Sequence, residues 1–173
     1  MLLTLRGTPF IYYGEEIGMR DAAIPADSKR DPVGRDGCRS PMQWSDARNG
    51  GFSTSARTWL PCGDFEAVNV ARQLNDPHSM FALYRRLIEL RKSTPALIEG
   101  SYRALDNAPE DCLVFHRDTV AQHIVVALNF TAEPREIDLT AGKILLSTID
   151  DRLAESVESP LTLGPNEGVI MML

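Results

Sequence analysis

The sequence predicts an α/β region over residues 1–96, followed by an all-β region of antiparallel strands over residues 97–173. An apolar run at residues 9–13 precedes a long amphipathic helix, which is the pattern of an α/β unit. From about Ser101 the apolar residues recur at every second position, as they do in strands. The charge divides at the same place, because residues 1–96 carry a net +2 and residues 97–173 a net −8.

The apolar run at residues 9–13 predicts a short strand buried on both faces. It reads PFIYY and lies between Gly7 and Gly14, so aromatic and β-branched residues are bounded by turn formers. The preceding residues 1–7 resemble the last turns of a helix. A chain that begins within a helix is expected to be a fragment of a longer protein.

The clearest single element is a helix that begins after Asp76. Asp76 is a good N-cap, and Pro77 would occupy the first helical position. The segment Ser93-Thr94-Pro95 is expected to end the helix. One apolar stripe follows the three- and four-residue spacing of a helix face, and consists of Met80, Leu83, Tyr84, Leu87 and Leu90.

The connection between this strand and this helix, residues 14–75, is the candidate functional segment. Such connections usually span about 2–6 residues. Disorder is disfavoured here because the segment contains tryptophan, phenylalanine, methionine and leucine. In a (β/α)8 barrel the loop that follows a strand lies on the face where active sites are built.

The all-β region is predicted to be an antiparallel sandwich. Ile124, Val126, Leu128 and Phe130 would share one face of a strand. Short strands at this spacing, separated by turn residues, are typical of sandwiches. The predicted strands are residues 112–116, 123–130, 135–139, 143–148 and 169–173.

Composition excludes several classes of function. A net charge of −6 argues against nucleic acid and anionic membrane surfaces as partners. No apolar run reaches the length of a membrane span. Cys38, Cys62 and Cys112 lack C-x-x-C spacing and are interpreted as reduced thiols of a cytoplasmic protein or as small buried apolar residues, and no metal cluster is expected.

Two segments carry a specific resemblance. GTPFIYYGEEIG at 7–18 resembles the eighth barrel strand of glycoside hydrolase family 13, the α-amylase superfamily. GRDGCRSPMQW at 34–44, NGGFS at 49–53 and TWLP at 58–61 are similar to the following loop in its α-glucosidase and oligo-1,6-glucosidase branch. The resemblance continues through VNV at 68–70, LIELR at 87–91 and NFT at 129–131.

The resemblance implies that residues 1–96 are the C-terminal part of a (β/α)8 barrel and that residues 97–173 are a C-terminal β domain. The family's nucleophile, general acid and third carboxylate lie upstream of the part resembled here, so no catalytic residue is expected in this chain. The intact parent would hydrolyse α-linked oligosaccharides with retention, through a glucosyl-aspartate and without an organic cofactor. The missing N-terminal barrel segment would be the physical partner of this chain.

Arg35 is the residue predicted to contact substrate. In proteins that this chain resembles, the arginine of Gly-Arg-Asp binds the non-reducing glucose, and a guanidinium offers fixed donors for hydroxyl oxygens. Asp36 would orient Arg35, and Glu16 would line the barrel mouth. A catalytic pair of Glu15 and Glu16 is disfavoured, because adjacent residues leaving a strand point to opposite faces.

Other loop residues are assigned structural roles. Arg39 is expected to bind backbone carbonyls of the loop. The aromatic side chains of Tyr13, Trp44, Phe52 and Trp59 could stack on sugar faces, but buried aromatics in a long loop more often form its own small core. Trp44 and Trp59 are therefore predicted to be structural.

Two alternatives to a hydrolase stay open. A trehalose synthase or sucrose isomerase shares much of the same pattern, including RNGGF at 48–52. The non-catalytic heavy subunits of amino-acid transporters have the same barrel and similar PMQW and TWLP segments, although the retained Gly34-Arg35-Asp36 favours an enzyme.

Overall fold

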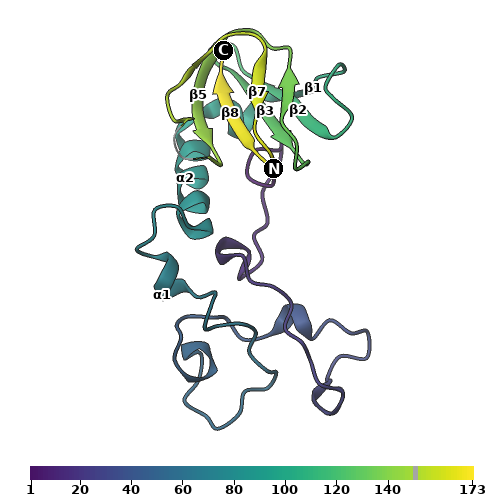
Figure 1. Ribbon diagram of the computed structural model, residues 1–173, viewed down its shortest axis with the longest axis vertical. Helices are drawn as coiled ribbons and strands as arrows, with labels where there is room; N and C mark the ends of the chain where they lie inside the picture. The colour runs from purple at the N-terminus through teal and green to yellow at the C-terminus, as the bar shows by residue number, and fades with distance from the viewer. Residues whose placement is uncertain (150–151) are drawn as a thin grey trace. The chain divides into compact units, whose positions relative to one another are not determined.

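The computed structural model describes residues 1–149 and 152–173, and its contacts divide the chain into two compact units. One unit consists of Met1–Phe10 with Arg86–Leu173, and the other of Ile11–Arg85. All the assigned strands belong to the first unit (Figure 1), which we call the β unit. We call Ile11–Arg85 the loop unit. The division falls within helix α2, Met80–Ser93, whereas the sequence prediction placed the boundary after residue 96.

The β unit contains a six-stranded antiparallel sheet with the strand order β1-β2-β3-β8-β5-β6. A second sheet consists of two strands, β4 and β7. The strands are β1 (Ser101–Ala104), β2 (Cys112–Asp118), β3 (His123–Asn129), β4 (Arg135–Ile137), β5 (Gly142–Ser147), β6 (Ser156–Val157), β7 (Leu161–Leu163) and β8 (Gly168–Met172). A strand is therefore present at each of the five segments predicted from the sequence. The strands β1, β6 and β7 were not predicted from the sequence.

One hydrophobic core is shared by the two sheets. Val125 and Ala127 of β3, Ile137 of β4 and Leu163 of β7 are all buried members of it. The alternate β3 residues Ile124 and Val126 are also fully buried, on the other face of the sheet. The short helix α3, Pro95–Glu99, contacts β2 and β3. Phe130, predicted to continue the Ile124 face, instead lies beyond β3 and is exposed.

The first residues of the chain are tied to the β unit by two arginines. Arg117 of β2 has a fully buried side chain, and its Nη1 donates to the carbonyl of Thr4 at 2.6 Å. Arg91 of α2 donates from Nη1 to the carbonyl of Leu3 and from Nη2 to that of Gly7. Residues 1–7, predicted to end a helix, form hydrogen-bonded turns. These contacts explain why Met1–Phe10 belongs to the β unit.

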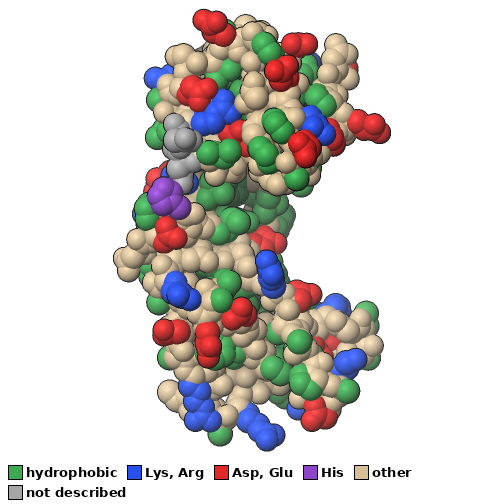
Figure 2. Space-filling view, viewed as in Figure 1, with side chains coloured by type: hydrophobic (Ala, Val, Ile, Leu, Met, Phe, Trp, Pro, Cys, Tyr) green, Lys and Arg blue, Asp and Glu red, His purple; other side chains and the backbone are tan. Residues whose placement is uncertain are grey.

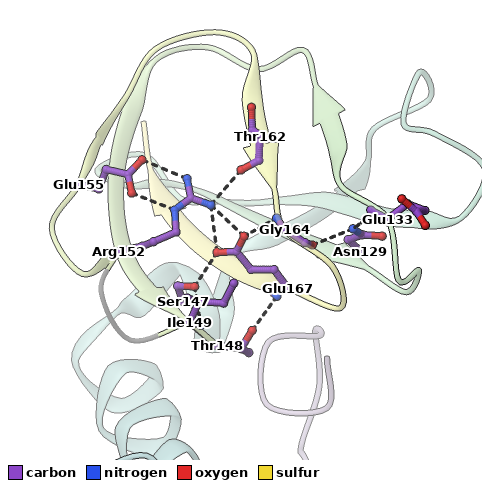
Figure 3. A network of polar contacts seen from close by, with 11 residues as sticks. Asn129, Glu133, Ser147, Thr148, Ile149, Arg152, Glu155, Thr162, Gly164 and Glu167 are labelled. Carbon is purple, nitrogen blue, oxygen red and sulfur yellow. Dashed lines mark hydrogen bonds and ion pairs between the residues drawn. The ribbon is translucent and has the colours of Figure 1, made fainter.

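A polar network lies at one end of the β unit (Figure 3). The carboxylate of Glu167, which is buried, accepts hydrogen bonds from the Ser147 hydroxyl, the Gly164 amide and Nη1 of Arg152. Arg152 also contacts the carboxylate of Glu155. Acidic side chains are spread over the visible face of this unit (Figure 2), in keeping with the negative charge of residues 97–173.

The strand predicted at residues 9–13 is not formed. Residues 8–12 pair with no described strand, and Phe10 is 83% exposed although it was expected to be buried. A parallel strand needs neighbours that accept and donate its backbone hydrogen bonds, and none of the described residues supplies them. The prediction of a strand is therefore wrong for this chain, and the apolar side chains of this segment are left at its surface.

The loop unit is ordered by turns rather than by long elements. It contains four 3-10 turns, Glu15–Ile17, Ala26–Ser28, Gly37–Arg39 and Arg48–Gly51, and the short helix α1, Val70–Gln73. Its interior holds Ile17, Met42, Gln43 and Leu60, and Nε2 of Gln43 donates to the carbonyl of Val68 at 2.7 Å. The chain therefore satisfies its buried polar groups across the loop itself.

Helix α2 begins later than the sequence predicts. Its cap is Ser79, whose hydroxyl oxygen accepts from the amide of Ala82 at 3.1 Å. Asp76, the predicted N-cap, accepts instead from the amide of His78, so Pro77 lies in the preceding turn. The helix ends at Ser93 as predicted. Every residue of its apolar stripe is exposed or only half-buried in this chain.

Candidate functional site

The Gly34-Arg35-Asp36 segment is anchored by Asp36. The Asp36 side chain is buried and its carboxylate accepts from the amide of Arg30 at 2.7 Å and from the amide of Asp31 at 2.9 and 3.1 Å. The amide of Arg39 donates to the Asp36 carbonyl and closes the turn Gly37–Arg39. Asp36 therefore fixes the backbone at both ends of the arginine-bearing loop.

Asp31 is the side-chain partner of both loop arginines. Its Oδ2 accepts from Nε of Arg35 at 2.6 Å and from Nη1 of Arg39 at 3.0 Å. Its Oδ1 accepts from the amide of Val33 at 2.8 Å. The hydrogen bond from Arg35, followed by that from Val33, lowers the pKa of the Asp31 carboxyl below its ordinary value. The same pairing raises the pKa of Arg35.

These contacts correct two details of the sequence interpretation. Arg35 is oriented by Asp31, because the carboxylate of Asp36 is turned inward to backbone amides. Arg39 binds the Asp31 carboxylate rather than backbone carbonyls. Asp31 received no role in the sequence analysis, although its spacing of four residues from Arg35 is a signal for an ion pair. More than half of the Arg35 side chain and almost half of that of Arg39 are exposed.

Beside this ion pair the loop unit has an open cavity of about 500 Å³. Four aromatic residues form part of its wall, namely Tyr13, Trp44, Phe52 and Trp59. Glu16, Arg39 and Ser40 supply polar groups. Tyr13 is held in place by its hydroxyl, which donates to the carbonyl of Ser40 at 2.8 Å. Desolvation raises the pKa of this phenol.

The exposure of the two tryptophans contradicts their predicted place in a buried loop core. Trp44 is 51% exposed and Trp59 is 77% exposed. The buried residues of the loop interior instead include Met42, Gln43 and Leu60. The guanidinium of Arg30 lies over the Trp59 ring, 5.4 Å from its centroid.

Glu15 and Glu16 lie in one 3-10 turn, so they do not leave a strand as expected. The Glu16 carboxylate accepts from the amide of Gly14 at 2.8 Å and lines the cavity, whereas that of Glu15 accepts from the amide of Tyr12. Gly14 has φ of +91°, and a Cβ there would lie 2.6 Å from the Met19 sulfur. This glycine is therefore required for the turn that presents Glu16.

Across residues 1–149 and 152–173, no group of three or more His, Cys, Asp and Glu side chains is arranged to hold a metal ion. In the same part of the chain, no helix is long and apolar enough to cross a membrane.

The chain is similar to known proteins along nearly its whole length. Residues 1–100 match the family model described as α-amylase, catalytic domain. Glucan 1,6-α-glucosidase of Streptococcus pneumoniae is 33% identical over 95% of this chain. Oligo-1,6-glucosidase of Halalkalibacterium halodurans is 32% identical over 96% of this chain. The structure of trehalulose synthase MutB from Pseudomonas mesoacidophila superposes with a TM-score of 0.89, at 30% identity over 99% of this chain.

The chain spans only about a third of these relatives, since it covers 35% and 37% of the two glucosidases and 36% of the trehalulose synthase. The family model nevertheless matches more than half of the chain, and it includes the whole loop that holds Asp31, Arg35 and the aromatic cavity. This chain belongs to the α-amylase superfamily, glycoside hydrolase family 13.

Proposed function

We propose that this chain supplies the C-terminal third of a retaining α-glucosidase that acts on short α-linked oligosaccharides. The observation that carries the proposal is the exposed guanidinium of Arg35, presented on the Gly-Arg-Asp loop by Asp31 within a chain of this family. The names of the two glucosidase relatives support hydrolysis of α-glucosidic bonds.

In the intact protein, residues 1–96 would complete a (β/α)8 barrel and residues 97–173 would form a C-terminal β-sandwich. The surface exposure of residues 10–13 and the half-buried stripe of α2 support this assignment, because both would gain partners from further barrel strands and helices. The three catalytic carboxylates would lie in the rest of the barrel. The free thiols of the three cysteines are compatible with a cytoplasmic location.

Arg35 would act on substrate through its donors. Asp31 holds Nε, and the guanidinium offers further N–H groups that can bind sugar hydroxyls or a neighbouring carboxylate. A fixed cation also favours the ionised form of a carboxylate nucleophile beside it. Arg35 is therefore a candidate for binding the glucosyl unit at the point of bond cleavage.

A chimera tests this proposal. The segment of the Halalkalibacterium halodurans oligo-1,6-glucosidase that matches this chain is replaced by residues 1–173, and hydrolysis of p-nitrophenyl α-glucoside is measured. We expect turnover by the chimera and none above the buffer rate by the isolated chain, because nucleophile and acid would be missing. A cooperatively folded chimera without turnover, or a pure isolated chain with turnover, would contradict the proposal.

Isomerisation is a second candidate, supported by the name of one structural neighbour, trehalulose synthase MutB, whose solved structures include a complex with sucrose. Product analysis of the chimera with sucrose separates the two reactions. Hydrolysis yields glucose and fructose, whereas isomerisation yields a new glucosyl-fructose. Because this test transfers only residues 1–173, a change of product from that of the parent glucosidase would assign isomerisation to the residues of this chain.

A further inference from the structure

We infer that Asn49-Gly50 is a covalent modification site, at which the asparagine deamidates without an enzyme when the turn Arg48–Gly51 opens. Asn49 is the only one of the six asparagines in the sequence that precedes a glycine. Because glycine has no Cβ, nothing shields its backbone nitrogen from the side chain before it. Such a reaction would limit the lifetime of the native loop unit, whatever the activity of the intact protein.

The chemistry needs only the chain and water. The backbone nitrogen of Gly50 attacks Cγ of Asn49, the bond from Cγ to Nδ2 breaks, and Nδ2 leaves as ammonia after it takes up the proton of the Gly50 amide. The product is a five-membered imide, which water then opens. Addition of water at Cγ gives aspartate, and addition at the backbone carbonyl of Asn49 gives isoaspartate, in which the main chain runs through Cγ. Both products carry a new carboxylate, which is ionised at neutral pH.

The turn itself requires this reactive pair of residues. Asn49 has φ of +56° and Gly50 has φ of +64°, both in the left-handed region that glycine and asparagine adopt at least cost. A Cβ on Gly50 would lie 3.3 Å from Cβ of Phe65. The Gly50 carbonyl accepts from the amides of Trp44 and Ser45 at 2.8 and 3.0 Å. Residue 50 therefore approaches the loop interior closely, and a larger side chain there would disturb the turn.

The atom that the reaction removes also holds the neighbouring segment. Nδ2 of Asn49 donates to the carbonyl of Ser53 at 3.1 Å and to that of Ser55 at 2.8 Å. An ionised aspartate at this position has only acceptor oxygens, so both hydrogen bonds would be lost and the carboxylate would face two carbonyl oxygens. An isoaspartate would in addition lengthen the main chain by one carbon within the turn. The modified turn therefore cannot re-form its native contacts.

The native turn blocks the reaction as long as it stays closed. Ring closure requires the Gly50 nitrogen to lie on the same side of the Cα–C bond as Cβ of Asn49. With ψ of +31° at Asn49, that nitrogen points nearly away from Cβ, so the peptide between the two residues must rotate first. This rotation would break the hydrogen bonds from Trp44 and Ser45 to the Gly50 carbonyl. Deamidation therefore proceeds from the open turn, at a rate proportional to the open population, and traps the chain in that state.

The rate of deamidation can be measured site by site. The chain 1–173 and a synthetic peptide of residues 46–57 are incubated in the same mildly alkaline buffer, and low-pH digestion followed by mass spectrometry locates the product. We expect conversion at Asn49 in the chain to be at least roughly ten-fold slower than in the peptide, since the turn must open first. Urea below the unfolding midpoint should raise the rate in the chain and leave that of the peptide nearly unchanged.

The chain also supplies two controls for the site of reaction. Asn166 has a positive φ of +52°, as Asn49 does, but it precedes Glu167, so its side chain should stay unmodified over the same period. The variant Asn49→Gly keeps a residue suited to the left-handed conformation and has no side chain that can deamidate. Its peptide map should therefore not change on incubation.

The consequence for stability is measured with the same samples. Asn49→Asp reproduces one product of the reaction and should lower the urea midpoint of the loop unit relative to the wild type. The midpoint of the wild-type chain should fall toward that of Asn49→Asp as incubation proceeds, whereas Asn49→Gly should keep its initial midpoint. Tryptophan fluorescence follows this unfolding, because Trp44 and Trp59 are the two tryptophans of the chain and both belong to the loop unit.

Three results would overturn the inference. Equal rates in the chain and in the peptide would show that the turn exerts no control over the reaction. A native chain without product at Asn49, after the peptide has been fully converted, would show that the turn does not open on this timescale. Conversion at Asn49 without any fall in the urea midpoint would show that the hydrogen bonds of its side chain do not hold the loop together.

Discussion

The carboxylate of Asp31 accepts a hydrogen bond of 2.6 Å from Nε of Arg35 and so determines where the guanidinium of this exposed arginine lies. Asp31 is itself held by its backbone amide, which donates to the buried carboxylate of Asp36. The Gly-Arg-Asp loop is thus ordered from the inside outward, from Asp36 to Asp31 to Arg35. Substitutions along this series are therefore expected to differ in their effects on substrate binding and on the stability of the loop unit.

Replacement of the two arginines separates substrate binding from loop stability. In the chimera, Arg35→Lys keeps the charge but loses the planar fork, and should lower kcat/KM roughly ten- to two-hundred-fold. Arg39→Lys should mainly lower the melting temperature, with a smaller effect on kcat/KM. Both quantities are measured for both variants. Normal turnover by Arg35→Lys, together with an activity loss in a stable Arg39→Lys protein, would show that the wrong arginine was chosen.

The Asp31 ion pairs predict a pH dependence of stability. Because the pKa of the Asp31 carboxyl is lowered in the folded chain, its stabilisation is fully present above the pKa of the unfolded chain. This stabilisation is lost as the pH falls below about 4, the pKa of the unfolded chain, and then through the lower pKa of Asp31 in the folded chain. Asp31→Asn should therefore lower the urea midpoint of the loop unit at pH 7, and the difference from the wild type should shrink on acidification. A difference that stays constant down to pH 3 would exclude this ion pair as its cause.

The network around Glu167 predicts that two substitutions in the β unit lower its stability by different amounts. Glu167→Gln weakens the buried hydrogen bonds of this side chain while Arg152 keeps Glu155 as a charged partner, and should cost about 1–3 kcal/mol of unfolding free energy. Glu155→Gln removes an exposed partner of the same arginine, and should cost less than about 1 kcal/mol. Urea unfolding followed by circular dichroism measures both. Equal effects would mean that burial of Glu167 has no energetic consequence.

The hydrogen bonds from Arg91 and Arg117 to residues 1–10 predict which fragments stay together after limited proteolysis. A protease of broad specificity should cut within residues 11–85, which are ordered mainly by turns, and leave a core that begins near residue 86. The peptide 1–10 should remain bound, because Arg117 and Arg91 donate to its carbonyls. Arg117→Met should release it. Mass spectrometry of the purified core gives its first residue and shows whether the peptide 1–10 is present. A core that begins near residue 97 without the peptide would support the boundary predicted from the sequence.

The sequence by itself located helix α2 and five of the strands. Period-two alternation located a strand at five places between residues 112 and 173, because alternation is a property of neighbouring residues. The helical spacing and the Ser93-Thr94-Pro95 stop gave the end of α2, and only its cap was misplaced, at Asp76 instead of Ser79. The motifs of the loop were sufficient to place the chain in its family.

Only the tertiary structure decided which groups meet. The hydrogen bond between Arg117 and Thr4 joins residues 113 positions apart, and no local pattern encodes such a pair. Likewise, Asp31 rather than Asp36 holds Arg35, because burial of Asp36 commits its carboxylate to backbone amides. The apolar run at residues 9–13 had the composition of a strand but has no partner strand among the described residues, and Trp44 and Trp59, predicted to lie in a buried core, are exposed. Pairing and packing depend on neighbours brought by the fold, so composition alone cannot determine them.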